Sequence, residues 1–309
     1  MTLAVLRITL RPTGAVHDPY LLFRVRNGFE GAFRRAVGCE KGECGWCDRS
    51  ADCPCRSVFA QKLSSDPVAV KRHQKPPLPF AFSFPVLRTP PNAGLTFEVR
   101  LALVGTATRF VTEFVAAIKI LFAKHAERDE LAAVVERVES LGYHDEPSLL
   151  YSEGQPAEIE DSLTLLTAEG LCDSRLLNNG TRIRLHLVTP LKIMREGKAL
   201  RHFSFSIFMR TLMRRVSSLA AHYCDDSLSA DFRWLASLCE TVVVSNSSIR
   251  WVEWGGGKQG GKLAGLTGEV TVVVVPEEFI PFLLLGELLN VGKGAAFGLG
   301  RYSLAVESS

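Results

Sequence analysis

The stretch TRIRLHLVTP at residues 181–190 decides how the second half of this chain is interpreted. Ile183, Leu185 and Leu187 alternate with polar side chains, which is the period of a strand with one buried face, and a proline ends the run. Residues 203–224 instead repeat apolar side chains at helical spacing. A strand followed by an amphipathic helix is the first part of a βαββαβ unit.

The rest of the second half completes this unit. A short helical segment at 231–240 precedes two strand-like stretches, 241–254 and 265–275, which a glycine-rich turn separates. PEEFIPFLLLGELLN at 276–290 predicts a helix with acidic residues in its first turn. RYSLAV at 301–306 predicts a closing strand.

The first half repeats the same order more loosely. Its predicted elements are a strand at 3–12, a helix at 27–38, strands at 80–84 and 95–104, and a helix at 109–126. The fourth strand is expected near 148–151 or further on. We therefore predict an α+β protein with tandem ferredoxin-like (RRM-like, βαββαβ) domains, at 1–165 and 166–309, with a Cys-rich loop inserted in the first.

Composition limits the function only broadly. The chain has 309 residues, 47% of them hydrophobic and 22% charged, which is enough to bury a core in two domains. A formal net charge of +3 is too small to indicate nucleic acid by itself. We find no secretion signal and no apolar run long enough to cross a bilayer, so we expect a soluble cytoplasmic protein with no membrane partner.

Five of the eight cysteines fall within residues 39–55. Without a secretion signal, this clustering favours reduced thiols over disulfides. A Cys-x2-Cys pair lets two thiolates reach one ion, so we interpret the loop as a structural zinc site. The preferred ligands are Cys39, Cys44, Cys47 and Cys53, with Cys55 either spare or in place of Cys39. A redox or iron–sulfur role and unligated thiols are the alternatives.

A second glycine-rich segment, near the C-terminus, is NVGKGAAFGLGRYSL at 290–304. Its four glycines are Gly292, Gly294, Gly298 and Gly300, and two cations, Lys293 and Arg301, accompany them. Glycine lets backbone amides approach a phosphate where a Cβ would intrude. The segment is not a nucleotide-binding P-loop, since no Gly-Lys-Ser/Thr follows and it leads from a helix into a strand. A plain connector is the alternative.

Several motifs together resemble a known family. They are VTPLKI (188–193), MRTLMRRVSSLAAHYC (209–224), WGGGKQGGKLAGLTGEV (254–270) and LLLGELLNVGKGAAFGLGRYSL (283–304). In this order they resemble the CRISPR-associated pre-crRNA processing endoribonucleases of the RAMP superfamily. GFEGAFRRAV (28–37), followed by the Cys-rich loop, is similar to the cysteine-bearing branch of that family.

The resemblance implies two ferredoxin-like domains that bind repeat RNA and cleave it without a catalytic cofactor. A ribose 2′-hydroxyl attacks the adjacent phosphate, a base takes its proton and an acid protonates the leaving 5′ oxygen. The products are a 2′,3′-cyclic phosphate and a 5′-hydroxyl. Zinc in the Cys-rich loop would then be structural. The alternatives are a non-cleaving RAMP subunit that binds crRNA in an effector complex, and a zinc or redox protein on the same scaffold.

The candidate catalytic residues are His17, Tyr20 and His202. His17 is preferred because it follows the first strand and many family members keep a catalytic histidine near the first helix, although that helix contains none here. Tyr20 could bond the sugar or phosphate, or simply pack. His202, just before the second domain's long helix, is the second choice. A solvated loop histidine is the structural alternative.

Arginine and lysine clusters are the candidate phosphate contacts. They are Arg24, Arg26, Arg34, Arg35, Arg210, Arg214, Lys258 and Lys262, together with the glycine segment and its Lys293 and Arg301. A solvated or internally paired helix face is the alternative for each arginine. We also expect RNA rather than protein to complete the packing around the glycines. Repeat RNA is the expected partner; other effector subunits and a second copy of the chain are further candidates.

Overall fold

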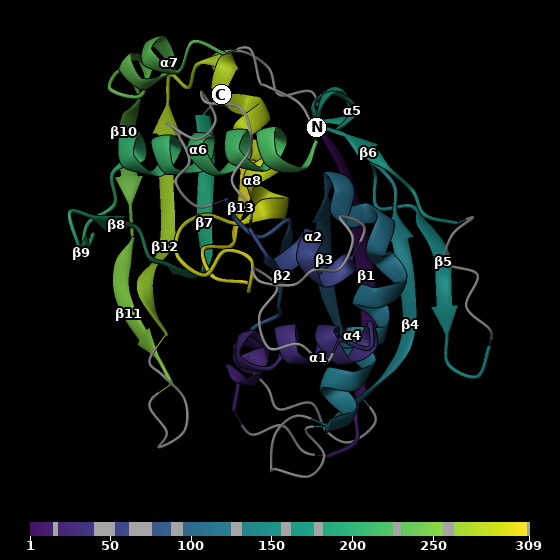
Figure 1. Cartoon of the computed structure of the whole chain (residues 1–309). Helices are drawn as coiled ribbons and strands as arrows, with labels where there is room; N and C mark the ends of the chain where they lie inside the picture. The colour runs from purple at the N-terminus through teal and green to yellow at the C-terminus, as the bar shows by residue number, and fades with distance from the viewer. Residues whose placement is uncertain are drawn as a thin grey trace.

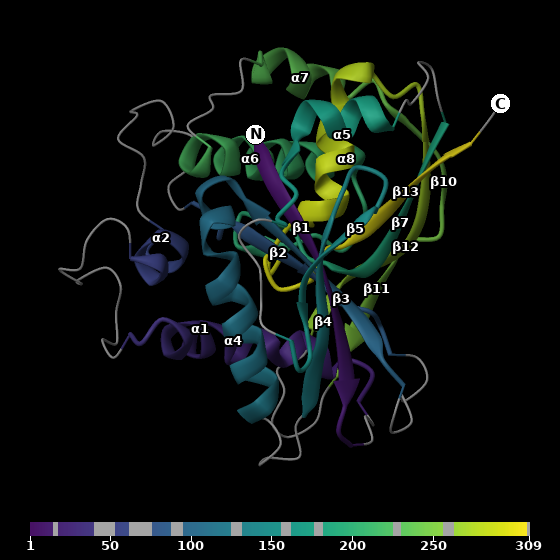
Figure 2. The ribbon, with the colours of Figure 1, turned by 90° about the vertical axis from the view of Figure 1, so that its right-hand side faces the viewer.

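The computed structural model describes residues 1–14, 18–39, 53–61, 76–87, 95–124, 132–155, 162–175, 182–224, 230–255 and 263–307. They form two antiparallel sheets that stand beside each other, with helices packed on both (Figures 1 and 2). This arrangement confirms the α+β class and is consistent with tandem ferredoxin-like domains. Residues 40–52, which include most of the Cys-rich loop, lie outside the described residues.

The first sheet has the strand order β2-β3-β1-β4-β5. Its strands are β1 (Thr2–Pro12), β2 (Phe80–Ser83), β3 (Phe97–Val104), β4 (Ala133–Leu141) and β5 (Pro147–Ser152), and β6 (Leu166–Thr167) pairs with β1. Its helices are η1 (Leu21–Asn27), α1 (Phe29–Ala36), α2 (Pro54–Phe59), η3 (Gly105–Phe110) and α4 (Val111–Lys124). Alternate β1 side chains, from Ala4 to Leu10, pack in one core with the phenylalanines of α1 and α4.

The fourth strand lies earlier than the sequence predicts. It is β4, and the segment predicted near 148–151 is the fifth strand, β5. The pairing of β4 with β1 shifts between Thr9 and Leu10, which is a β-bulge. Val135 and Val138 are consequently both buried although they stand three residues apart. The bulge therefore hides the two-residue period by which a strand is recognised.

The second sheet has the order β10-β12-β7-β13, and β11 also pairs with β12. Its strands are β7 (Arg182–Leu191), β10 (Val243–Ser247), β11 (Arg250–Trp254), β12 (Leu263–Val273) and β13 (Tyr302–Glu307). The helices are α5 (Ala168–Ser174), α6 (Phe205–Tyr223), α7 (Phe232–Leu238), η5 (Glu277–Phe279) and α8 (Ile280–Leu289). The predicted order is confirmed, except that the stretch 241–254 forms two strands rather than one.

The two halves share a core. Leu3 and Val5, on the face of β1 away from α1, are buried in the same cluster as Leu283 of α8 and Phe208 of α6. The first sheet thus packs on the helices of the second half. None of the helices in the described ranges is long and apolar enough to cross a membrane.

Candidate nucleic-acid interface

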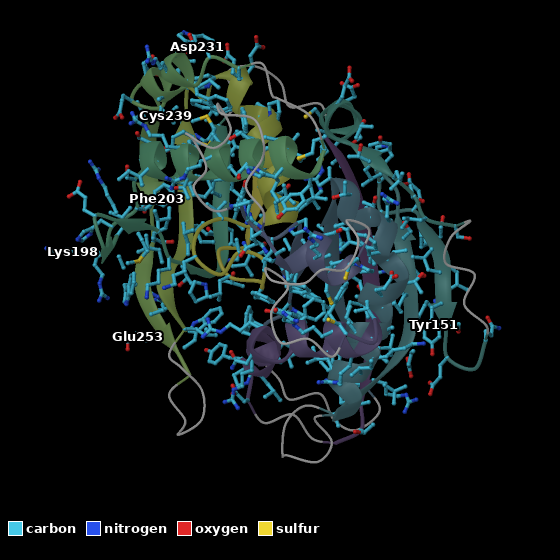
Figure 3. All side chains as sticks on the ribbon, viewed as in Figure 1. Tyr151, Lys198, Phe203, Asp231, Cys239 and Glu253 are labelled. Carbon is cyan, nitrogen blue, oxygen red and sulfur yellow. The ribbon has the colours of Figure 1, made fainter. Side chains whose placement is uncertain are left out.

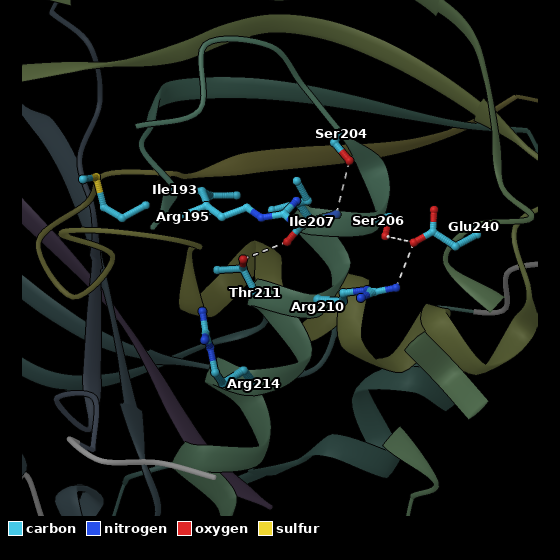
Figure 4. Close-up of a pocket in the computed structure, with 10 residues that line it drawn as sticks. Ile193, Arg195, Ser204, Ser206, Ile207, Arg210, Thr211, Arg214 and Glu240 are labelled. Atoms are coloured by element: carbon cyan, nitrogen blue, oxygen red, sulfur yellow. Dashed lines mark hydrogen bonds and ion pairs between the residues drawn. The ribbon is translucent and has the colours of Figure 1, made fainter. Parts of the chain in front are cut away.

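A groove of about 510 Å³ lies between α6 and a hairpin that precedes it (Figure 4). At one end, Arg210 donates to the Glu240 carboxylate at 2.8 Å and to the Ala236 carbonyl at 3.0 Å. At the other end lie Arg195 and Arg214, both exposed. Because Glu240 neutralises Arg210, the groove is cationic at the end formed by Arg195 and Arg214.

The hairpin consists of β8 (Met194–Arg195) and β9 (Lys198–Ala199), joined at Glu196 and Gly197. Both turn residues have positive φ, 51° and 78°, as a type I′ turn requires. The hairpin projects from the side of the molecule, and Lys198 lies at its outer edge (Figures 1 and 3). We call residues 192–202 the basic hairpin.

The basic hairpin carries four cations that the sequence analysis did not select: Lys192, Arg195, Lys198 and Arg201. Arg201 lies over the Trp251 ring of β11, 3.8 Å from its centroid, which orients its guanidinium. Arg195 forms a 3.7 Å ion pair with the adjacent Glu196, where both side chains are over 60% exposed, so water screens this pair strongly. A glycine-containing turn between basic residues was the available sequence signal.

The four arginines of the first half that were predicted to contact phosphate are of two kinds: two form ion pairs within the protein and two are exposed. Arg24 pairs with Asp18 at 2.7 Å, and Arg34 pairs with Glu30 one helical turn away at 2.8 Å. Arg26 and Arg35 are exposed. The internally paired alternative thus describes Arg24 and Arg34, and Arg26 and Arg35 present their charge to solvent.

The glycine segment 292–300, which we call the glycine loop, connects α8 to β13 and packs against protein. All four of its glycines have positive φ. A Cβ at Gly298 would lie 2.6 Å from the Phe84 ring, and one at Gly300 would overlap the Val291 carbonyl oxygen. The expectation that RNA completes the packing is wrong at Gly298 and Gly300, which are buried and have protein atoms in the space beside them.

The glycine loop is also hydrogen-bonded to the edge of the first sheet. The Phe82 amide of β2 donates to Ala296 O at 2.9 Å, and Phe82 and Phe297 form an isolated bridge. Arg301 donates from Nη1 to Phe84 O at 3.0 Å, and burial lowers the pKa of its guanidinium. Lys293 remains exposed. Of the two predicted cations, Lys293 therefore faces solvent and Arg301 joins the domains.

The three predicted catalytic residues are not found together in the described structure. His17 lies outside the described residues, as do Lys258 and Lys262. Tyr20 stacks on Trp254 of β11 with ring centroids 4.6 Å apart, so it lies at the contact between the two halves. His202 is exposed in the basic hairpin, two residues before Ser204, which lines the groove. The structure thus places Tyr20 at the domain junction, and His202 near the groove in sequence but not among the residues that line it.

Another arginine of α6 is buried without being in the groove. Arg215 donates from Nε to the carbonyl of Leu289 at the end of α8, at 2.9 Å. Burial lowers the pKa of this guanidinium to about 10. The charge faces the negative end of the α8 dipole, which is a structural role rather than a place for RNA.

Two of the four proposed zinc ligands, Cys44 and Cys47, lie outside the described residues. Cys53 is the residue preceding α2 and is buried, and Cys39 is half-buried after α1. Cys55 is fully buried in the first core, which suits a packing role. Within the described ranges, no group of three or more His, Cys, Asp or Glu residues is arranged to hold a metal ion. The zinc site stays a prediction.

The fold and this site define a class: an α+β protein with two antiparallel sheets, consistent with tandem ferredoxin-like domains, in which a glycine loop of the second half packs against the first sheet. Family models agree. Residues 185–302 match CRISPR-associated endoribonuclease Cas6, and residues 1–163 match the AF_1859_N N-terminal domain. The AF_1859_N match spans more than half of the chain, so the chain belongs to that family. The Cas6 match covers a smaller part, and it makes residues 185–302 similar to the Cas6 endoribonucleases.

Solved structures share the fold at low identity. A Cas6 (TTHB231) product complex, from a protein of Thermus thermophilus, is 16% identical with a TM-score of 0.57, covering 98% of this chain and 100% of that chain. A Cas6 (TTHA0078) product complex is 18% identical with a TM-score of 0.54, covering 100% of both chains. A partial Cas6-RT-Cas1–Cas2 complex is 13% identical with a TM-score of 0.59, and this chain, 99% covered, spans 46% of it. A search of curated proteins finds no match.

Proposed function

We propose that this protein matures CRISPR RNA by binding the repeats of the precursor and cleaving each one. The observation that carries the proposal is the Cas6 match over residues 185–302, which contains the whole groove and the glycine loop. The cationic end of that groove, with Arg195 and Arg214, supplies charge for an RNA backbone. The solved relatives include product and substrate-mimic complexes of Cas6 proteins.

The proposed chemistry is a metal-independent transesterification. A base removes the proton from a ribose 2′-hydroxyl, and the oxygen attacks the adjacent phosphorus. The bond from phosphorus to the 5′ oxygen breaks, an acid protonates that oxygen, and a 2′,3′-cyclic phosphate and a 5′-hydroxyl result. Nearby cations and amide donors stabilise the charge that develops on the phosphate oxygens.

His202 and His17 are the proposed proton-transfer residues, with Tyr20 as a hydrogen-bond donor to the sugar or phosphate. The position of His202 supports a role in proton transfer: it is exposed at the end of the basic hairpin, just before the first turn of α6. Substrate held along Arg195 and Arg214 would pass close to this segment. Tyr20 would need to leave its stack on Trp254, or bond through its hydroxyl while stacked.

The test is incubation of the pure protein with end-labelled repeat RNA in EDTA. We expect one cut per repeat, with a 2′,3′-cyclic phosphate end on the upstream product. His202→Ala and His17→Ala each test one residue, and a variant that cleaves at the wild-type rate removes that residue from the mechanism. If RNA binds but stays intact, the protein is instead a RAMP subunit that holds crRNA.

Three further proposals accompany this function. Zinc in the Cys-rich loop would be structural, and metal analysis of Cys47→Ser tests it: unchanged zinc content removes the assignment. Other effector subunits and a second copy of the chain are proposed partners, to be tested by co-purification and light scattering. A cytoplasmic location in a prokaryote follows from the proposed substrate.

A further inference from the structure

Asn290 has an unusual backbone for a residue with a side chain. It follows α8, its φ and ψ are 56° and 174°, and it is completely buried. Glycine adopts a positive φ without steric cost, and this chain uses glycine at four positions nearby. A strained residue persists where its surroundings hold it, so the side chain of Asn290 must provide an interaction that glycine could not.

That interaction is a bridge between the domains. The Asn290 Nδ2 group donates one hydrogen bond to Phe82 O on the edge strand β2 and another to Ala295 O in the glycine loop, both at 2.8 Å. A primary amide has two N–H donors on one nitrogen, which this bridge uses in full. A carboxylate of the same shape has no donor and would repel both carbonyl oxygens.

Other contacts hold the same face of the glycine loop. The Thr189 hydroxyl, fully buried in β7, donates to Gly298 O at 2.8 Å and accepts from the Arg301 amide at 2.8 Å. Arg301 in turn reaches Phe84 O beyond the end of β2. The inner face of the loop is thus fixed at three places along its length, and Asn290 makes the bridge nearest to α8.

The loop also carries groups that a phosphate could use. Lys293 is exposed. The amides of Gly292 and Gly294 have no hydrogen-bond acceptor within the described part of the chain. The amide between them, that of Lys293, donates to Lys192 O at 2.8 Å, so the two glycine amides can bind one anion together only while the backbone holds its conformation. Hydrogen bonds on the inner face therefore determine the geometry of these groups.

We propose that Asn290 is a positioning residue for RNA: it locks the glycine loop to β2 and so presents Lys293 and the loop amides in one conformation. The inference rests on the proposed function. Asn290 does not touch RNA, since it is buried beneath the loop. Without it, the loop must be ordered when RNA binds, which weakens binding and leaves the chemical step unchanged.

The experiment compares Asn290→Gly with the wild type. Glycine removes the bridge and also relieves the positive φ, so this variant separates loss of the bridge from backbone strain. Asn290→Asp keeps the shape and abolishes the donors. Asn246→Ala is the matched control, because Asn246 is exposed on β10 and distant from the loop in sequence. If Asn290→Gly does not unfold cooperatively, and so is not folded, Thr189→Val replaces it in the test, because it removes the hydroxyl that bonds Gly298 and Arg301.

Two measurements decide the outcome. In single-turnover cleavage of repeat RNA, we expect the half-saturating protein concentration to rise about tenfold with the maximal rate within about threefold. In hydrogen exchange, we expect faster exchange in 290–300 and in β2 together, with RNA restoring protection. Wild-type values for Asn290→Gly, or a loss confined to the maximal rate, overturn the inference. Wild-type protein that does not bind RNA overturns the proposed function instead.

Discussion

The glycine loop and the basic hairpin differ in a way that their sequences conceal. The loop, with four glycines and two cations in ten residues, has the composition of a mobile RNA-binding segment, yet its inner face is packed and bonded to β2. The basic hairpin has one glycine and no glycine-rich signature, yet it projects from the side of the molecule (Figure 1) and three of its four cations are exposed. In the glycine loop, glycines occur where neighbouring atoms leave no room for a Cβ. In the basic hairpin, charges are exposed because a tight turn holds them away from the rest of the protein.

The comparison predicts that an added methyl group is far costlier in the loop than in the hairpin. Gly300 and Gly197 both have positive φ, 68° and 78°, but a Cβ at Gly300 would overlap the Val291 carbonyl oxygen while one at Gly197 meets nothing within 4 Å. We expect Gly300→Ala to lower the free energy of unfolding by at least about 3 kcal/mol. Gly197→Ala should cost about 1 kcal/mol, the left-handed backbone penalty alone.

Urea unfolding of both variants measures this difference. Equal losses would mean that the loop moves aside without cost, and the packed interpretation of the glycine loop would then be wrong.

The second prediction concerns another contact between the halves, the stack of Trp254 on Tyr20. Trp254 also contacts Phe23 edge-on, with centroids 5.9 Å apart. We expect Trp254→Ala to lower the free energy of unfolding by about 2 kcal/mol, since it removes a partly buried ring from the junction. The control is Trp234→Ala on α7, 47% exposed, which should change stability by less than about 0.5 kcal/mol. Similar values for the two variants would show that the stack does not join the domains.

The third prediction tests whether the basic hairpin contacts RNA. Replacing Arg195 and Lys198 by alanine should weaken repeat-RNA binding about tenfold near physiological salt and reduce the slope of log K against log salt by about two. The control is Arg137→Ala, whose side chain is 58% exposed. Arg137 belongs to β4, which lies on the opposite side of the molecule from the basic hairpin (Figure 1). Filter binding over a salt series measures both. An unchanged slope in the double variant, or an equal change in the control, contradicts a hairpin contact.

Sequence reasoning predicted the elements whose periodicity is regular. β7, α6 and α8 were predicted because their apolar residues repeat without interruption. β4 was misplaced because a bulge interrupts its alternation, and 241–254 was predicted as one strand because its interruption at 248–249 leaves no compositional trace.

The candidate site was less predictable because charge depends on partners distant in sequence. Nothing near Arg210 in sequence reveals that Glu240, thirty residues on, neutralises it, and Asp18 does the same for Arg24. The bridge by Asn290 joins residues 208 apart. Exposure of Arg195 and Lys198, in contrast, follows from the local Glu196–Gly197 turn, which could have been recognised.

The smallest expected effect concerns pH and the helix that supports the glycine loop. The Glu287 side chain of α8 is 13% exposed, accepts from the Leu304 amide at 2.6 Å and pairs with Arg175. Burial is the main cause that raises the pKa of its carboxyl above the ordinary value. A carboxyl whose pKa is higher in the folded state contributes stability below its ordinary pKa and loses it as pH rises through the raised value.

Glu287→Gln cannot ionise, so the stability of the wild type relative to this variant should fall as pH rises from about 4 to about 7. Urea unfolding of both proteins at the two pH values measures it. A relative stability that rises with pH would mean that the ion pair with Arg175 outweighs burial. The helix that supports the glycine loop would then be stabilised by a salt bridge that solvent screens, as it screens the charges of the basic hairpin. The glycine loop and the basic hairpin would then differ less than their packing indicates.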